Sequence, residues 1–192
     1  MLDNAKNKLV VISGCSSAGK STLLAELSDN GYTVMPEVGR ELVKEQLSLN
    51  SDALPWKEPI LFCELLIQKS IKRYHEAMQF ESVKDNVIFF DRCFLEGISY
   101  FQTINIHKYD HIVSELRYYP AIFMTPPWEE IFCEDAERKN SFGNAVAEYD
   151  RLLEYYVKYG YELITLPKVS VKERHRFIID QIKGHSHDNL AR

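Results

Sequence analysis

Residues 14–21 have the types and spacing of a loop that binds phosphate, since they read G-C-S-S-A-G-K-S. An apolar run, 9–12, precedes this loop, and a helix-forming run, 22–27, follows it. In that setting the backbone N–H groups of the loop surround the α- and β-phosphates of a nucleotide, and the positive end of the helix dipole faces them. The alternative is a glycine-rich turn that only joins a strand to a helix. The flanking runs favour a nucleotide site, and its expected residues are Gly14, Cys15, Ser16, Ser17, Ala18, Gly19, Lys20, Ser21 and Thr22.

Two side chains of this loop have distinct expected roles. Lys20 is placed to reach the β- and γ-phosphates, where its ammonium group would stabilise the charge of a transferring phosphoryl group. The hydroxyl of Ser21 is placed to bind Mg²⁺, a cation that keeps several waters and needs only one or two protein oxygens. The sequence thus predicts Mg²⁺ as the cofactor and ATP or GTP as the nucleoside triphosphate.

A second candidate metal ligand follows another apolar run, 87–90. Asp91 follows this run, and a carboxylate at the end of a strand beside the loop's own strand can hold a Mg²⁺-bound water. The alternative role of Asp91 is that of a helix N-cap. Arg92 comes next, and its guanidinium group suits bidentate binding of a substrate phosphate; the alternative is a structural ion pair.

Glu37 and Arg40 stand where a further strand run, 32–36, ends. In open α/β sheets ligands bind outside the carboxyl ends of the strands. We expect Glu37 to orient or deprotonate the hydroxyl of an acceptor, and Arg40 to bind an anionic acceptor. The alternative is that Glu37 only places negative charge in the first turn of the next helix.

The segment near 129–145 is predicted to form a mobile lid. Arg138 and Lys139 precede the polar turn 140–143, and they would bring positive charge over the transferring phosphoryl group. In this interpretation Arg138 is catalytic and Lys139 binds the substrate. The alternative is a solvated helix face. The loop 167–170 is expected to lie near the nucleotide base.

The elements that must position these residues follow from five short apolar runs that alternate with helical patterns. This alternation is typical of parallel βαβ units, so we expect an α/β fold. Gly31 and Gly160 are each expected to end a helix in the left-handed conformation. A long helix, covered over much of its circumference, is predicted at 56–80, after a linker at 48–52. The expected strands are 9–13, 32–36, 86–91, 121–125 and 161–166.

The composition of the chain excludes several classes of protein. Its 192 residues carry a net charge of −5, and no basic stripe indicates a nucleic-acid partner. The apolar stretches reach about four residues, whereas a membrane span needs roughly 20. No secretory leader is recognisable, so we expect a cytoplasmic protein with one domain over 1–192 and a frayed C-terminal end from about residue 184.

The four cysteines lack the spacing and the neighbouring histidines of a zinc site. Reduced, structural thiols are therefore expected. Cys15 is the exception, because a loop cysteine beside a helix N-terminus is expected to have a lowered pKa and to be oxidisable.

Seven stretches of the chain together match one known family: 14–21, 36–42, 52–56, 89–92, 126–131, 135–139 and 160–167. They resemble the NadR-like predicted-ATPase family, which is grouped with the AAA ATPases by name and has the plan of P-loop nucleoside and nucleotide kinases. The resemblance implies a three-layer α/β fold with a five-stranded parallel sheet in the order 2-3-1-4-5, a kinase-like site and Mg²⁺-dependent binding of ATP or GTP. No sensor or arginine-finger element of the AAA rings is recognisable, so a small-molecule phosphotransferase is favoured over a mechanical ATPase.

The sequence therefore predicts a Mg²⁺-dependent kinase that transfers the γ-phosphoryl group of a nucleoside triphosphate to a small molecule. The alternative is a nucleotide-switched binding protein or NTPase that acts on a protein or on an anionic lipid. The identity of the acceptor stays open at this point.

Overall fold

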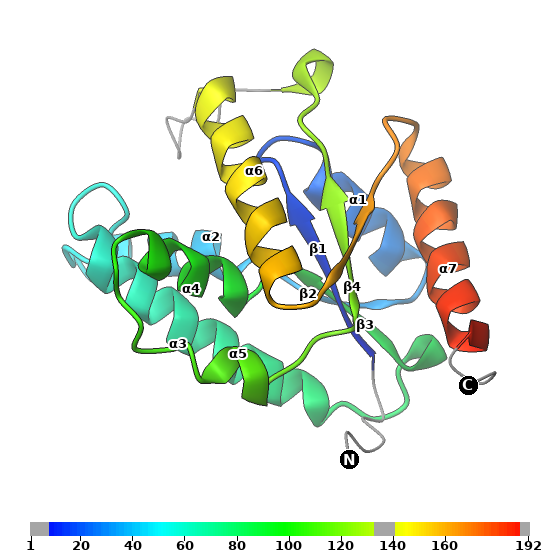
Figure 1. Ribbon diagram of the computed structural model, residues 1–192, viewed down its shortest axis with the longest axis horizontal. Coiled ribbons are helices and arrows are strands. Elements are labelled where there is room, and N and C mark those ends of the chain that lie inside the picture. The colour runs from blue at the N-terminus through cyan, green and yellow to red at the C-terminus, as the bar shows by residue number, and fades with distance from the viewer. Residues whose placement is uncertain (1–7, 133–140, 189–192) are drawn as a thin grey trace.

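A computed structural model describes residues 8–132 and 141–188 of the chain. Its centre is a five-stranded parallel sheet in the order β2-β3-β1-β4-β5, as the family resemblance implies (Figure 1). Strong β-formers fill the central strands, which are buried on both faces because helices cover both sides of the sheet. The strands are β1 (Lys8–Gly14), β2 (Thr33–Met35), β3 (Val87–Asp91), β4 (Ala121–Thr125) and β5 (Glu162–Thr165).

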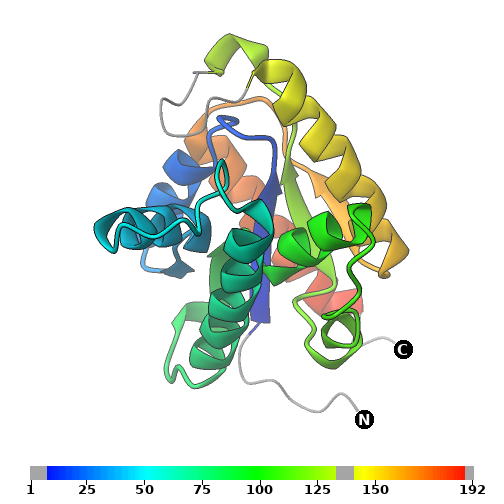
Figure 2. The same ribbon diagram turned by 90° about the vertical axis from the view of Figure 1, so that its left-hand side faces the viewer.

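Helices form the outer two layers around this sheet (Figures 1 and 2). One layer consists of α1 (Lys20–Asp29) and α7 (Val171–Asp188), and the other contains α3 (Pro59–Met78), α4 (Phe94–Thr103), α5 (Ile112–Glu115) and α6 (Phe142–Lys158). α2 (Val38–Ser48) packs on α3. Two 3-10 turns, Lys84–Asn86 and Glu129–Ile131, complete the described elements.

The core is divided between the two faces of the sheet because side chains alternate along each strand. In β1, Val10 and Ile12 pack with α1 and α7, whereas Leu9 and Val11 pack with α3, α4 and α6. Gly31 and Gly160 have φ angles of 86° and 75°, which confirms the predicted left-handed ends of the helices before β2 and β5.

The predicted helix at 56–80 is shorter and less covered than expected. α3 begins at Pro59, whose ring cannot follow an earlier helical turn, and Trp56 lies in the preceding loop. Ile60 and Leu61 are 49% and 47% exposed, so the prediction that much of the circumference is covered is wrong for the first turn.

The C-terminal helix extends further than the sequence indicates. α7 continues to Asp188, past residue 184, where we expect fraying. Across the described residues, no helix combines the length and the apolar character needed to cross a bilayer.

Candidate functional site

The phosphate-binding loop closes tightly on the end of β4. Gly14 has a φ of 113°, and a Cβ atom there would lie 2.4 Å from the carbonyl oxygen of Thr125. Cys15 N–H donates to that same carbonyl at 2.9 Å. Gly19 also has a left-handed φ, 76°, directly before α1. Glycine is therefore required at both positions, because a side chain would meet the backbone of β4 at the first and be strained at the second.

The side chain of Lys20 lies against a backbone carbonyl group of this loop. Its Nζ donates to the carbonyl of Cys15 at 2.8 Å, and the side chain is buried. Burial is the largest influence on its pKa and, with the nearby Arg92, lowers that pKa to about 8, although Asp91 acts in the opposite direction. An anion arriving at the loop would favour the protonated ammonium group.

We therefore expect triphosphate binding to take up protons at Lys20. Near pH 8 the free protein holds Lys20 about half protonated, so a bound triphosphate that raises this pKa draws in up to about half a proton per site. The affinity should fall as the pH rises through 8, because only the charged ammonium pairs with phosphate. Calorimetry in two buffers of different ionisation enthalpy measures the uptake.

The matched control for this measurement is Lys20→Met, which should show no proton uptake in the same pH range. A wild-type protein that binds the triphosphate with identical heats in both buffers would contradict the assignment of Lys20 to the phosphates.

Asp91 lies beside the loop because β3 pairs with β1 in the register Ile12 to Asp91. Its side chain is buried, and within the described residues its Oδ1 has no hydrogen-bond partner. Burial raises the pKa of this carboxyl group, while Lys20 lowers it. A buried carboxylate oxygen without a donor fits a cation, so the residues present suit a Mg²⁺ ion or one of its waters.

The described residues contain no group of three or more His, Cys, Asp or Glu side chains able to hold a metal by themselves. Mg²⁺ at a triphosphate needs no such group, because phosphate and water oxygens supply most of its ligands. Ser21, which lines the same cavity as Asp91, offers the second protein oxygen.

Arg92 has a left-handed backbone, with a φ of 65°, and lies in a cluster of carboxylates. Its Nη1 donates to Glu96 and, at 3.0 Å, to Glu148 of α6. Glu96 also accepts hydrogen bonds from Ser13 at 2.6 Å and from Tyr156 at 3.2 Å. The pKa of Arg92 lies well above its ordinary value because these carboxylates outweigh the effect of burial.

This cluster ties the end of β1 to α4 and α6, and it shows the structural ion pair that the sequence left open as the alternative for Arg92. A role of Arg92 in binding substrate stays a prediction.

Glu37 occupies the N-cap position of α2 without making a side-chain capping bond there. Its carboxylate pairs with Nε of Arg40 at 3.1 Å and lies 3.8 Å from Nε of Arg92. The side chain of Glu37 is only 11% exposed, whereas that of Arg40 is 47% exposed. The acid is therefore held by arginines rather than by the helix it precedes.

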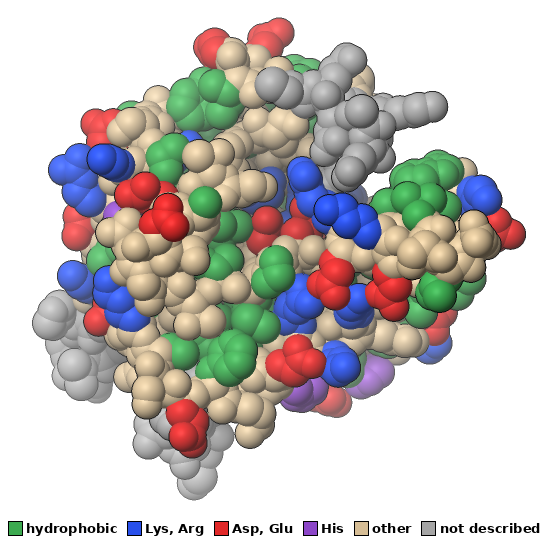
Figure 3. Space-filling model, turned by 180° about the vertical axis from the view of Figure 1, so that it is seen from behind, with side chains coloured by type: hydrophobic (Ala, Val, Ile, Leu, Met, Phe, Trp, Pro, Cys, Tyr) green, Lys and Arg blue, Asp and Glu red, His purple; other side chains and the backbone are tan. Residues whose placement is uncertain are grey.

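Two cavities meet at these residues. One, of about 540 Å³, is lined by the phosphate-binding loop, including Ser16, Lys20 and Thr22, and we call it the nucleotide cavity. The other, of about 500 Å³, lies between α2, α3, α4 and α6, and we call it the acceptor cavity. Both are lined by Glu37, Arg40 and Asp91. Figure 3 shows a hollow in the face seen from behind, with acidic and basic side chains gathered around it.

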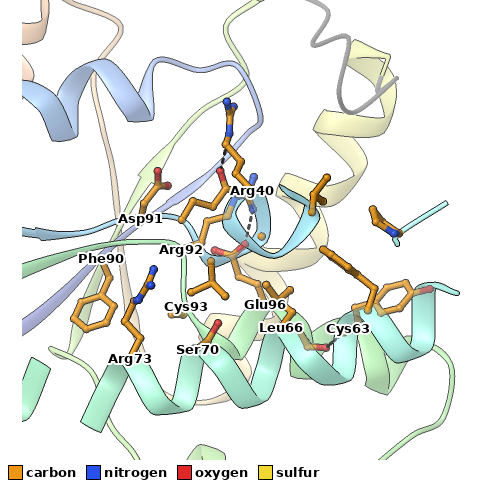
Figure 4. Close-up of a pocket in the computed structure, with 18 of the residues that line it drawn as sticks. Arg40, Cys63, Leu66, Ser70, Arg73, Phe90, Asp91, Arg92, Cys93 and Glu96 are labelled. Atoms are coloured by element: carbon orange, nitrogen blue, oxygen red, sulfur yellow. Dashed lines mark hydrogen bonds and ion pairs between the residues drawn. The ribbon is translucent and has the colours of Figure 1, made fainter. Parts of the chain in front are cut away.

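Many of the side chains that line the acceptor cavity are apolar. Figure 4 shows Leu66 and Ser70 of α3 on the side of the cavity facing Asp91 and Arg92. The remaining apolar lining includes Pro55, Trp56, Phe62, Phe90 and Tyr100.

The expectations for Cys15 and for the turn 140–143 need correction, and those for two lid residues cannot be compared with the structure. Burial raises the pKa of Cys15 despite the nearby Lys20, so the predicted lowering is wrong. Arg138 and Lys139 lie outside the described residues. Of the predicted turn 140–143, Ser141 is instead the N-cap of α6, accepting from Asn144 N–H at 3.3 Å, and residues 142–143 are helical.

Arg174 is the main site residue that the sequence analysis missed. It lines the nucleotide cavity from the first turn of α7, together with Val169 and Ser170 of the loop expected near the base. Ser170 and Glu173 form a reciprocal cap, because Ser170 donates to Glu173 and Glu173 N–H donates back to Ser170 Oγ. The spacing S-x-x-E marks a helix start and would have placed Arg174 at this end of the sheet.

Comparison with known proteins agrees with this geometry. The model of a family described as an AAA domain matches residues 9–174, and the chain belongs to that family. A search of curated proteins found no match.

Solved structures with this fold include several kinases. Deoxyadenosine kinase from M. mycoides with bound dATP is 19% identical, with a TM-score of 0.60 over 92% of this chain and 100% of that one. Thymidylate kinase from Ehrlichia chaffeensis is 16% identical, with a TM-score of 0.58 over 92% and 98%. The NadR protein in complex with NR is 16% identical, with a TM-score of 0.67 over 92% of this chain and 50% of that one. At these identities the likeness establishes a P-loop kinase-like fold.

Proposed function

We propose that this chain is a Mg²⁺-dependent phosphotransferase that moves the γ-phosphoryl group of ATP or GTP to a hydroxyl group of a small molecule. The observation that carries the proposal is the pair of cavities that meet at Glu37, Arg40 and Asp91. A kinase needs two adjoining binding spaces with an acid and a cation between them. A nucleotide-operated switch needs only the nucleotide cavity.

The lining of the acceptor cavity favours an acceptor with an apolar ring and no charge of its own. Three of its arginines already pair with acids, because Arg40 binds Glu37, Arg73 binds Glu41 and Arg92 binds Glu96. A fourth arginine of the cavity, Arg151, donates to Oγ of Ser99. An anionic acceptor that bound any of the first three arginines would have to displace a carboxylate. The aromatic and proline side chains that line the cavity suit a flat ring.

Nucleosides and pyridine ribosides combine such a ring with sugar hydroxyls. Two neighbours in fold support this class: the deoxyadenosine kinase, and the NadR protein with bound NR. We therefore propose a nucleoside-like acceptor, in place of the anionic acceptor that the sequence predicts at Arg40.

In the proposed reaction Glu37 accepts the proton of the attacking hydroxyl, since it is held at the junction of the cavities. Arg40 orients Glu37 and contacts the acceptor. Lys20 and Arg138 stabilise the charge that develops on the transferring group, and Lys139 contacts the substrate. Ser21 and Asp91 hold Mg²⁺, which, when bound, neutralises charge on the β- and γ-phosphates.

The decisive experiment is a screen for acceptor-dependent formation of nucleoside diphosphate. With Mg²⁺ and ATP or GTP, the wild-type protein should hydrolyse the triphosphate slowly by itself and turn over much faster with the right acceptor, because the acceptor completes the site and displaces water. Nucleosides and pyridine ribosides should be accepted in preference to their monophosphates. A different result would contradict the kinase. If the protein binds triphosphate but phosphorylates no acceptor, and if the bound nucleotide changes its affinity for a protein or a lipid, the protein is a nucleotide-operated switch.

A further inference from the structure

Arg174 presents a buried guanidinium group to the nucleotide cavity. The residue is only 4% exposed, and it lies in the first turn of α7, 156 positions after Ala18 in the chain. Its Nη1 donates to the carbonyl of Ala18 at 3.3 Å. A Cβ atom on Gly19 would lie 3.1 Å from both Nη1 and Nη2, so the guanidinium group covers the loop at its second glycine.

The charge of Arg174 has no counter-charge in the part of the chain that the structure describes. No carboxylate pairs with it there, and its Nε has no hydrogen-bond partner. Burial lowers its pKa, and no acid of residues 8–132 or 141–188 acts in the opposite direction. Arg92 is the contrast, since Glu96 and Glu148 neutralise that buried arginine.

A buried cation without a partner is costly, and the cost is removed when an anion binds. The ring of Trp128, whose centroid lies 5.5 Å from the guanidinium carbon, and the carbonyl of Ala18 hold Arg174 in place before any ligand arrives. Trp128 lines the nucleotide cavity, and Ala18 lies in the loop between two residues that line it, Ser17 and Gly19.

We propose that Arg174 is a second cationic ligand for the polyphosphate chain of the nucleotide, acting from α7 together with Lys20 of the loop. This inference rests on the proposed function, because it assigns a residue to the same nucleotide cavity. The proposed ligand is a di- or triphosphate, whose negative charge would pair with the buried guanidinium group. Through Arg174, a nucleotide bound at the phosphate-binding loop would also contact α7.

The test compares Arg174→Met with the wild-type protein in two measurements. The first is the thermal stability of the free protein, which should stay unchanged or rise, because the variant loses an uncompensated buried charge. The second is the affinity for inorganic tripolyphosphate and for ATP by calorimetry, which should fall about ten- to a hundredfold, the scale of a lost charge-assisted hydrogen bond. Arg174→Lys keeps the charge and should lose less than Arg174→Met.

Arg176→Met is the matched control, since Arg176 lies two residues further along α7, is exposed, and donates from Nε to the carbonyl of Lys172. It should leave both affinities unchanged. Where the methionine variant does not fold, Arg174→Gln provides the same two measurements with a polar side chain of smaller volume.

Two results would overturn the inference, and a third would overturn the proposed function on which it rests. Lower stability of the free Arg174→Met protein with unchanged tripolyphosphate affinity would show that Arg174 only fastens α7 to the loop. Loss of adenosine binding with unchanged tripolyphosphate affinity would show that it stacks on the base. A wild-type protein that binds no triphosphate would instead defeat the proposed function, and that result is recognised before any variant is made.

Discussion

Replacing Lys20 with methionine is expected to remove nearly all of the stabilisation that a nucleoside triphosphate gives this protein. At a ligand concentration of 100 Kd, the wild-type protein should gain about 2.7 kcal/mol in free energy of unfolding. Lys20 is the cation held inside the phosphate-binding loop, where its Nζ already contacts the carbonyl of Cys15. Thermal unfolding with and without Mg²⁺ and ATP or GTP measures the gain in both proteins.

The free Lys20→Met protein should remain folded, because burial makes the charge of this ammonium group unfavourable in the free state. Lys72→Met is the control, since the side chain of Lys72 is 78% exposed and pairs with Glu76, 3.8 Å away on the same helix. A Lys20→Met protein that keeps the full ligand-induced gain would refute the nucleotide site at this loop.

Replacing Glu37 with glutamine is expected to lower kcat for acceptor phosphorylation by about a hundredfold to ten thousandfold, the range for loss of a general base. Glutamine keeps the size of the side chain but neither accepts the proton nor carries the charge that faces Arg40 and Arg92. The affinity for the triphosphate should change little, because Glu37 faces it only where the two cavities meet. Steady-state kinetics with varied acceptor give kcat and KM separately.

Two further variants separate the roles of the residues around Glu37. Arg40→Ala should mainly raise KM for the acceptor, whereas Asp91→Asn should raise the Mg²⁺ concentration needed for activity while leaving Mg²⁺-free nucleotide binding intact. If Glu37→Gln turned over at the wild-type rate while Asp91→Asn did not, Asp91 would be the base in place of Glu37.

The local parts of this protein could be predicted from the sequence. The phosphate-binding loop is contiguous, so Gly14, Gly19 and Lys20 carry its geometry within eight residues. Gly31 and Gly160 mark the ends of helices, because a left-handed φ is inexpensive only without a Cβ atom. The alternation of strand and helix patterns was enough for the fold class, since each strand is defined by a short run of neighbouring residues.

The order of the strands was predicted from the resemblance to a family, and the structure confirms it. Only the register of β3 on β1 brings Asp91 beside the loop, and only burial without a donor makes its oxygen suit a cation. Similarly, Cys15 was expected to be acidic from its helix terminus, but the surrounding core raises its pKa. Desolvation depends on all neighbours in space and leaves no mark in the adjacent sequence.

The charged residues of the site show the same difference between what the sequence predicts and what only the structure reveals. Sequence shows that Glu37, Arg40 and Arg92 are present, but not that Arg92 is neutralised by Glu96 and Glu148, which come from α4 and α6. Nor does it show that Arg174, near the other end of the chain, donates to the carbonyl of Ala18 and pairs with no acid of the described residues. What the sequence determined was the five strands, the helix ends at Gly31 and Gly160, and the loop between β1 and α1, whose interactions are local. What the tertiary structure decided was which charges are compensated, because ion pairing and burial depend on packing between elements far apart in the chain.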